Sequence, residues 1–363
     1  MKSFLLFVPL MALAAPPLLD APHGPLGLPG SRVAPNLLLH LSLTLTDAGA
    51  AYTDDYNAGT EYAGYFNPRL CYVYPADTGY FSPAKAVGTN RECMDGFSGN
   101  LLNWASMSRI DLLRYALTGG HRFTDEPALT VLQRAWLPDG TYHVDFHANP
   151  AYFPRKAIKG GDGLTPFGVG TLYIVSCRDR ILFSEAGTGG SCDKPAGKQL
   201  GEFNVRVEVC GKVDSESRPQ LCKAYGTGFK PEGAIQQNAA FMRIGAMGYL
   251  AEAGAGDDNF YGGALRAPIK FVGTEWDAGT GVLIADPDGA GGTNSGLINY
   301  INLIGMRGQY KSSAPGAELF YEGLRYLQGR APSPETGDLA ADDGFAIWNT
   351  RDDPVTESCQ RSV

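Results

Sequence analysis

Charged side chains are scarce in this sequence, and no region of it is strongly basic. Lysine and arginine total 30 against 38 aspartates and glutamates, which gives a formal net charge of −8 over 363 residues. Only 19% of the residues are charged, and the lysines and arginines form no cluster. Because nucleic acids and anionic membranes attract concentrated positive charge, the composition argues against both as partners.

Motifs of nucleophilic catalysis and of nucleotide binding are also missing. The sequence has no G-x-S-x-G elbow and no G-x-x-x-x-G-K-[ST] phosphate loop. No two cysteines have the C-x-x-C spacing of structural zinc sites and thioredoxin-type centres. We therefore expect a protein that is not an enzyme and that needs no organic cofactor.

Long apolar stretches are absent except at the start of the chain. Lys2 precedes an apolar run that ends in small residues at Ala12–Ala14, which is the order of a signal peptide over residues 1–15. That run is much shorter than the ~20 residues of a membrane-spanning helix. Residues 16–34 are rich in proline and glycine and are predicted to be an extended linker. The mature protein is expected to be secreted and not to span a membrane.

Seven cysteines are present, and an exported chain can oxidise them. Pairing of sequence neighbours would close three short loops and leave Cys359 over, although the sequence alone does not fix the connectivity. The suggested pairs are Cys71 with Cys93, Cys177 with Cys192, and Cys210 with Cys222.

Strands alternate with helices along the ordered part of the chain, which indicates an α/β fold with a mainly parallel sheet. Asn36–Leu41 is expected to be a buried central strand, and the alternation in Phe203–Cys210 predicts a half-buried one. Further elements are expected as a hairpin at 171–177 and 180–185, a strand at 242–250, and helices at 98–120, 231–240, 295–304 and 315–328.

Six segments, in order along the chain, resemble segments of PilC/PilY-type proteins of type IV pili. The longest is SGNLLNWASMSRIDLLRYALTGG at 98–120; the others are 230–237 together with 242–249, then 262–266, 294–302, 318–327 and 359–361. The resemblance implies a von Willebrand factor A-like, Rossmann-like three-layer domain over 35–363. Disulfide-stapled insertions are expected near 47–97, 120–200 and 255–295. Family members continue into a C-terminal propeller, so the domain is expected to be incomplete at its C-terminus.

The same resemblance implies a role in pilus assembly or tip adhesion that depends on binding and involves no chemical step. The expected partners are minor pilins or the pilus tip, or a host or abiotic surface. The expected location is the periplasm, the outer membrane or the pilus tip.

A degenerate cation site is one alternative. Domains of this type often hold a metal through D-x-S-x-S after the first strand; here Ser42 stands where the aspartate belongs, with Thr44 and Thr46 at the hydroxyl positions and Asp47 one residue beyond. Such a site would take Ca²⁺ or Mg²⁺, but the main anionic ligand is missing. Ordinary packing at a strand end is the competing interpretation.

A secreted metal-dependent enzyme is the other alternative. On a strand, His143, Asp145 and His147 would share one face and could bind zinc or copper. A solvated strand face gives the same pattern without function. The Gly/Asp-rich segment 286–294 lacks the order of a calcium loop and is better explained as a turn before a helix.

Seven tyrosines fall within 52–80. Such aromatics favour a binding surface and are equally able to fix a long loop against its own sheet.

Overall fold

The computed structural model describes most of the chain between residues 34 and 349. The described residues are 34–160, 163–186, 191–194, 197–215, 217–218, 220–226, 228–250, 262–291, 294–337 and 343–349. The expected signal peptide, nearly all of the expected linker and Cys359 lie outside them, so those expectations stay predictions. Within this part of the chain no helix is long and apolar enough to cross a membrane.

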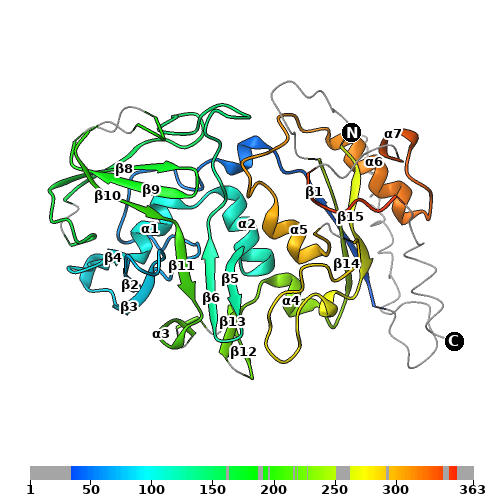
Figure 1. Ribbon diagram of the computed structural model, residues 1–363, viewed down its shortest axis with the longest axis horizontal. Coiled ribbons are helices and arrows are strands. Elements are labelled where there is room, and N and C mark those ends of the chain that lie inside the picture. Colours follow the sequence, from blue (N-terminus) through cyan, green and yellow to red (C-terminus); the bar gives the residue numbers. More distant parts are fainter. Residues whose placement is uncertain are drawn as a thin grey trace, which may run out of the picture.

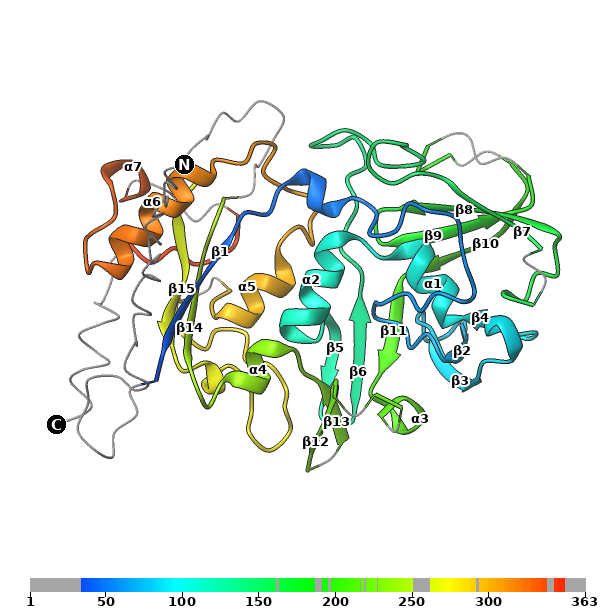
Figure 2. The same ribbon diagram turned by 180° about the vertical axis from the view of Figure 1, so that it is seen from behind.

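The described chain forms two lobes that lie side by side (Figures 1 and 2). The sheet lobe contains β1 (Asn36–Leu41), β14 (Arg243–Gly248) and β15 (Ala264–Lys270), together with α4–α7. The insertion lobe contains β2–β13 and α1–α3, and its residues lie between β1 and α4 in the sequence.

Three layers make up the sheet lobe. β14 lies between β1, which it pairs in parallel, and β15, which it pairs antiparallel. Side chains alternate across β14: Ile244 and Ala246 pack towards α5 (Leu297–Leu303), whereas Met247 packs towards α6 (Gly316–Leu327). The helices therefore cover opposite faces of the sheet (Figure 2). This arrangement agrees with the α/β class, and the von Willebrand factor A-like fold stays a prediction.

The strand expected to be central is an edge strand in the described sheet. β1 pairs only with β14, and Leu37 in β1 is 41% exposed. β14 is the central strand, with all six residues buried. Gly248 on β14 is required by packing, because a Cβ there would overlap the Tyr300 ring of α5. The apolar run in β1 correctly predicted a strand but could not reveal which of its edges would be paired.

The expectation of a mainly parallel sheet is wrong for the described strands, since β1–β14 is the one parallel pairing among their named ladders. The insertion lobe consists of small antiparallel sheets, in the orders β10-β9-β8-β7, β11-β6-β5, β3-β2-β4 and β12-β13. Short hairpins connect many neighbours, and short connections require antiparallel pairing. These strands are β2 (Leu70–Val73), β3 (Ser82–Ala86), β4 (Phe97–Ser98), β5 (Arg122–Glu126), β6 (Leu129–Gln133), β7 (Lys156–Lys159), β8 (Thr171–Cys177), β9 (Arg180–Ser184), β10 (Gln199–Asn204), β11 (Arg206–Val209), β12 (Cys222–Tyr225) and β13 (Gly228–Pro231).

The alternating segment 203–210 does not form one strand. Its first residues end β10, which pairs with β9, and β11 then pairs with β6 in another sheet. The break is at Val205, whose N–H donates to the Asp179 carbonyl at 2.7 Å while its carbonyl accepts from Arg134 N at 3.1 Å. The alternation of apolar residues continues across a change of partner, so periodicity alone could not reveal it.

The long helix expected at 98–120 is two helices, α1 (Gly99–Ser106) and α2 (Arg109–Thr118). Met107 is extended, and Ser108 begins α2 in a capping box with Asp111. Ser98 is the N-cap of α1, and Gly119 ends α2 in the left-handed conformation at φ 82°. The remaining helical segments are α3 (Lys212–Ser215), α4 (Ala234–Asn238), α7 (Pro334–Gly337) and the 3-10 turns η1 (Leu45–Ala48), η2 (Thr89–Arg91) and η3 (Val272–Thr274).

The tyrosine-rich segment packs mostly inward. Tyr62, Tyr65 and Tyr72 are at most 7% exposed and belong to the core of the insertion lobe. Disulfides join Cys71 to Cys93, Cys177 to Cys192, and Cys210 to Cys222, which are the pairs of sequence neighbours. Of the two interpretations of the tyrosines, the packing favours fixation of the insertion.

The lobes meet where α2 faces α5 (Figure 1). Arg114 on α2 donates from Nε to the Ile301 carbonyl at 3.2 Å and from a terminal nitrogen to the Ile304 carbonyl at the end of α5. Nη1 of Arg114 lies 3.5 Å from Oδ1 of Asp111, which is on the same helix, and both side chains are fully buried. A cation at the C-terminus of a helix is favourable, so the Arg114 guanidinium links α2 to α5 and thereby joins the two lobes.

Candidate functional site

The four residues of the expected cation site lie directly after β1, but the structure does not bring all of them together. Thr44 Oγ1 lies 3.0 Å from Thr46 Oγ1 and donates to Asp47 Oδ2 at 3.2 Å. Ser42 instead forms a 2.7 Å hydrogen bond with the Tyr249 hydroxyl at the end of β14. The Asp47 carboxylate also accepts from Thr44 N at 2.8 Å, so it caps η1. Cation binding here stays a prediction.

Replacing Asp47 separates capping from metal binding. For Asp47→Ala we expect a loss of about 1 kcal/mol in the free energy of unfolding, the typical value of a helix cap. Urea denaturation should give the same loss in EDTA and in excess Mg²⁺ or Ca²⁺. Stabilisation of the wild type by either ion, absent from the variant, would show that Asp47 ligates a metal.

The histidine cluster lies in the loop between β6 and β7, so its residues do not share a strand face. His143 Nε2 accepts from Tyr310 N at 3.1 Å, which ties this loop to the segment after α5. Asp145 Oδ1 accepts from His147 N at 2.8 Å and so closes a local turn. Burial lowers the pKa of His147. The three residues do not form a group with metal-ligand geometry in the described chain.

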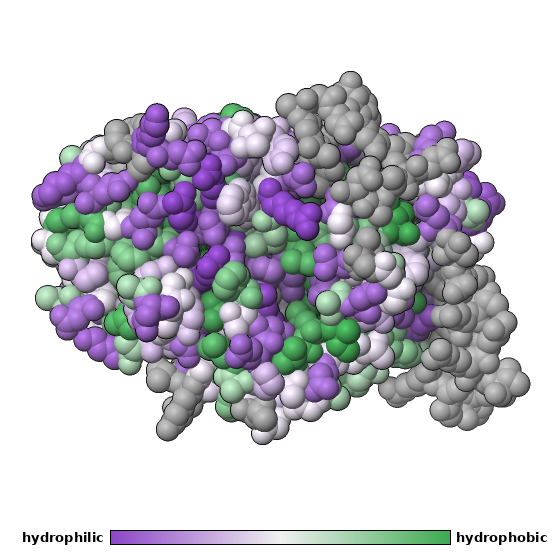
Figure 3. All heavy atoms as spheres, viewed as in Figure 1, coloured by the Kyte–Doolittle hydropathy of each residue, from purple (hydrophilic) through white to green (hydrophobic). Residues whose placement is uncertain are grey.

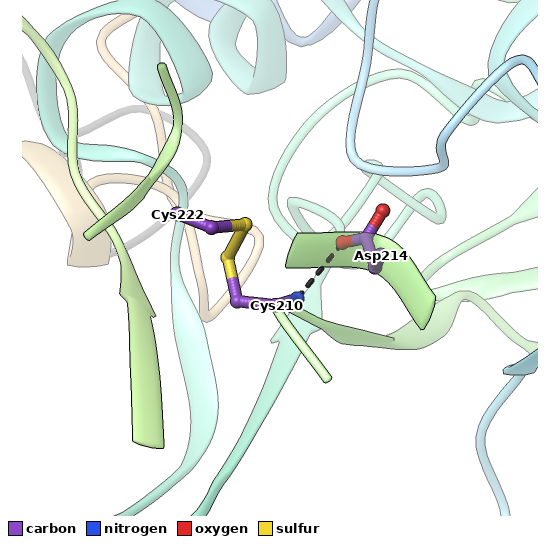
Figure 4. Close-up of side chains that lie close together, drawn as sticks. All are labelled: Cys210, Asp214 and Cys222. Atoms are coloured by element: carbon purple, nitrogen blue, oxygen red, sulfur yellow. Dashed lines mark hydrogen bonds between the residues drawn. A yellow bond between two sulfur atoms is a disulfide. The ribbon is translucent and has the colours of Figure 1, made fainter. Parts of the chain in front are cut away.

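One group of potential ligands does come together, and its chemistry excludes a metal. Cys210, Cys222 and Asp214 place their ligand atoms within 4.8 Å of one another. Figure 4 shows that the two sulfurs are bonded to each other, so neither is a free thiolate. Asp214 accepts from Cys210 N at 2.8 Å and pairs with Arg218. The group is a structural anchor for β12.

In the Gly/Asp-rich segment 286–294, the described residues 286–291 form a turn that precedes α5. Asp286 accepts from Ala290 N at 2.8 Å and from Ser295 Oγ at 2.5 Å, and these hydrogen bonds, Ser295 first, lower its pKa. Asp288 pairs with the ammonium group of Lys270, which also lies 3.2 Å from Glu275. A lysine thus supplies the positive charge among these carboxylates.

Glu275 is a buried helix-capping residue that the sequence did not reveal. Its carboxylate accepts from Leu297 N at 2.9 Å and Ile298 N at 2.8 Å and thereby caps α5. Burial raises its pKa, while the charge of Lys270 acts against that rise. The capping partner lies 22 residues away along the chain, so no local motif could have indicated it.

An exposed apolar surface lies on α6. We call it the α6 outer face; it consists of Phe320 (58% exposed), Tyr321 (50%), Leu324 (42%) and Leu327 (38%). The opposite side of the helix buries Leu319 and Tyr326 against the sheet. The His40 ring of β1 and the Phe320 ring meet edge to face, with centroids 6.0 Å apart, so the α6 outer face borders the β1 edge of the described sheet.

Elsewhere the surface is more mixed. On the face seen in Figure 3, hydrophilic and hydrophobic side chains are interspersed, with a group of hydrophobic ones near α4. Phe241, shortly after α4, is 71% exposed. Isolated exposed apolar residues are normal, whereas several on one helix indicate a contact surface.

The described residues make a disulfide-bonded α/β protein in which the candidate ionisable groups serve the fold. A family model described as "PilY1 homolog, small alpha/beta domain" matches residues 53–189. Two curated proteins of Xylella fastidiosa strain Temecula1 are similar, both named "Type IV pilus biogenesis factor PilY1 homolog". The chain is PilY1-like, which confirms the resemblance found in the sequence.

These similarities cover much of this chain but little of the relatives. The first relative is 30% identical over an alignment of 384 positions, gaps included, which covers 86% of this chain and 30% of the relative. The second relative is 26% identical over an alignment of 332 positions, which covers 76% of this chain and 22% of the relative. The chain therefore spans less than a third of the length of either. No solved structure matches it.

The matched domain is completed by strands beyond its boundary. Within 53–189, β6 pairs with β11 and β9 pairs with β10, although both partners follow residue 189. The insertion lobe is therefore larger than the matched segment.

Proposed function

We propose that this chain is a non-catalytic component of type IV pilus biogenesis that acts by binding other proteins of the pilus. The similarity over 86% of its length to a protein named as a pilus biogenesis factor carries this proposal. Three disulfides support an extracytoplasmic location, because such bonds persist in oxidising compartments. Within that location, we propose the periplasm, the outer membrane or the pilus tip.

The α6 outer face is the proposed contact surface. Several large apolar residues exposed together on one helix indicate a contact surface, and α6 carries four of them on its outer face. The proposed occupant is an apolar surface of a minor pilin or of another subunit at the pilus tip. Aromatic residues at the centre of such an interface typically supply much of the binding energy, which places Phe320 and Tyr321 at its core.

The experiment pairs two charged substitutions. For Phe320→Asp with Leu324→Lys we expect at least tenfold weaker binding to purified minor pilins, because both side chains lose apolar contact area at the interface. In a strain that lacks the gene, this variant should restore fewer surface pili than the wild type. Phe229→Asp on β13, where the side chain is 41% exposed, is the matched control.

The urea midpoint of unfolding of both variants should equal that of the wild type, because the altered side chains are exposed. If the α6 variant binds pilins and restores piliation as the wild type does, the α6 outer face is not the contact surface. If the wild-type chain binds no pilus component and its loss leaves piliation intact, the proposed function is wrong.

A further inference from the structure

A polar hollow of about 450 Å³ lies beside the β12–β13 hairpin, where the insertion lobe meets α4 and the segment after η3. Tyr225, Glu232, Gln236 and Trp276 are its partly or fully buried residues, and the exposed side chains of Gln220, Lys223 and Gln237 surround them. They come from the hairpin, from α4 and from the segment after η3. This hollow is separate from every residue considered above as a metal, catalytic or pilin-binding group.

The segment that carries Trp276 is held in place by its own hydrogen bonds and by the hairpin. Asp277 N donates to the Val282 carbonyl at 2.8 Å, and Ile284 N donates to the Glu275 carbonyl at 2.9 Å, so residues 275–284 form a tight hairpin-like turn. Gly226 N, at the tip of the β12–β13 hairpin, donates to the Gly279 carbonyl at 3.1 Å. The two turns are therefore fixed to each other.

Arg122 adds a second attachment below the hollow. Its terminal nitrogens donate to the Gly281 carbonyl at 2.7 Å and to the Pro231 carbonyl at 2.8 Å. Its guanidinium also pairs with Asp125 at 3.0 Å. One buried side chain thus joins both sides of the hollow, and a site fixed before binding loses less entropy when a ligand arrives.

The polar groups inside the hollow are oriented. The Tyr225 hydroxyl donates to Glu232 Oε1, and burial, followed by the neighbouring Glu232, raises the pKa of Tyr225. Gln237 Nε2 donates to the Gln220 carbonyl at 3.0 Å and to the Glu232 carbonyl at 3.3 Å, which fixes the amide plane. The Gln237 side chain is nevertheless exposed, so its oxygen can accept from a ligand.

This combination of groups selects a class of ligand. The lining contains two aromatic rings, side-chain amides, a carboxylate and a single lysine, and no aliphatic side chain. A lipid would need an apolar lining, and a phosphate or nucleic acid would need more positive charge. Hydroxyl groups that both donate and accept match the amides and the carboxylate, and an apolar ring face matches an aromatic one. We propose that this hollow binds a neutral saccharide.

Isothermal titration of the full chain with maltotriose, cellotriose and triacetylchitotriose, each separately, tests the proposal. Binding of at least one is expected in the millimolar range or better. Trp276→Ala and Gln237→Ala should each weaken that binding about tenfold, the loss that corresponds to about 1.4 kcal/mol. Val144→Ala, in the loop between β6 and β7, should leave it unchanged.

Trp276→Phe keeps an aromatic ring at this position and should retain most of the affinity for the sugar. This variant therefore tests the role of the ring even if Trp276→Ala does not fold. No binding of any of the three sugars would overturn the proposal, and so would equal affinity in Trp276→Ala, Gln237→Ala and the wild type. Binding restricted to a heparin-derived tetrasaccharide and lost in Lys223→Ala would show an anion site instead. The proposal is independent of pilin binding by α6, since the two sites share no residue.

Discussion

Asp111→Ala should lower the free energy of unfolding by about 3–5 kcal/mol, the usual loss when one partner of a buried ion pair is removed. The substitution leaves the Arg114 guanidinium, which is fully buried, without its carboxylate. It also removes the acceptor for the Tyr65 hydroxyl at 3.1 Å and for Ala135 N at 2.8 Å. The capping box that begins α2 is lost as well. Urea denaturation followed by circular dichroism measures the change.

Two further variants separate these contributions. Asp111→Asn keeps a side-chain oxygen for Ala135 N and should cost less than the alanine variant. Adding Arg114→Met to Asp111→Ala removes the uncompensated charge, so the double variant should lose less stability than the sum of the two single losses. A loss below about 1 kcal/mol in Asp111→Ala would show that the buried ion pair with Arg114 contributes little to stability.

Elements with strong local signals could be predicted from the sequence. The hairpin of β8 and β9, the buried strand β14 and the helices α5 and α6 lie where periodicity and glycines placed them. Each is defined by residues close together in the chain, such as the glycine at 329 with φ 67° after α6. The break between α1 and α2 was missed because Ser108 and Asp111 continue a helical spacing while also forming a cap.

Partners that are distant in sequence could not be predicted. The pairing of β11 with β6 joins segments about 75 residues apart, and the alternation of apolar residues in β11 is compatible with many partners. The same holds for Glu275, which caps α5 from another element, and for Ser42, which contacts Tyr249 across 207 residues. Candidate ligands that are near in sequence, such as His143 and His147, were dispersed because their segment forms no strand.

Buried charge in the insertion lobe is the property least visible in the sequence. A lysine in a short strand is ordinarily solvent-facing, yet Lys156 shares a face of β7 with buried Ile158 and is itself only 6% exposed. Its amine donates to the Trp104 carbonyl and lies 4.5 Å from the centroid of the Trp104 ring. Burial, together with the charge of Arg134, lowers the pKa of Lys156 to about 7.

This shift makes stability depend on pH in a defined direction. Unfolded Lys156 keeps its proton up to its ordinary pKa of 10.5, whereas the folded protein releases it above about 7. Between these values the unfolded state binds more protons, so the free energy of unfolding rises with pH. Below about pH 7 both states are protonated, and the folded protein there holds a charge in an apolar site.

Lys156→Met should abolish this dependence while filling a similar volume. From pH 6 to pH 9 the stability of the wild type relative to Lys156→Met should rise by about 3 kcal/mol, because two pH units above the folded pKa contribute about 1.4 kcal/mol each. At pH 6 the variant should be the more stable protein, since no buried charge remains. Lys159→Met, on the exposed side of β7, is the control and should show the wild-type pH dependence. If the difference in stability between wild type and Lys156→Met stays constant over this range, Lys156 keeps its proton in the core. The interpretation that its amine is neutral beside Trp104 would then be wrong.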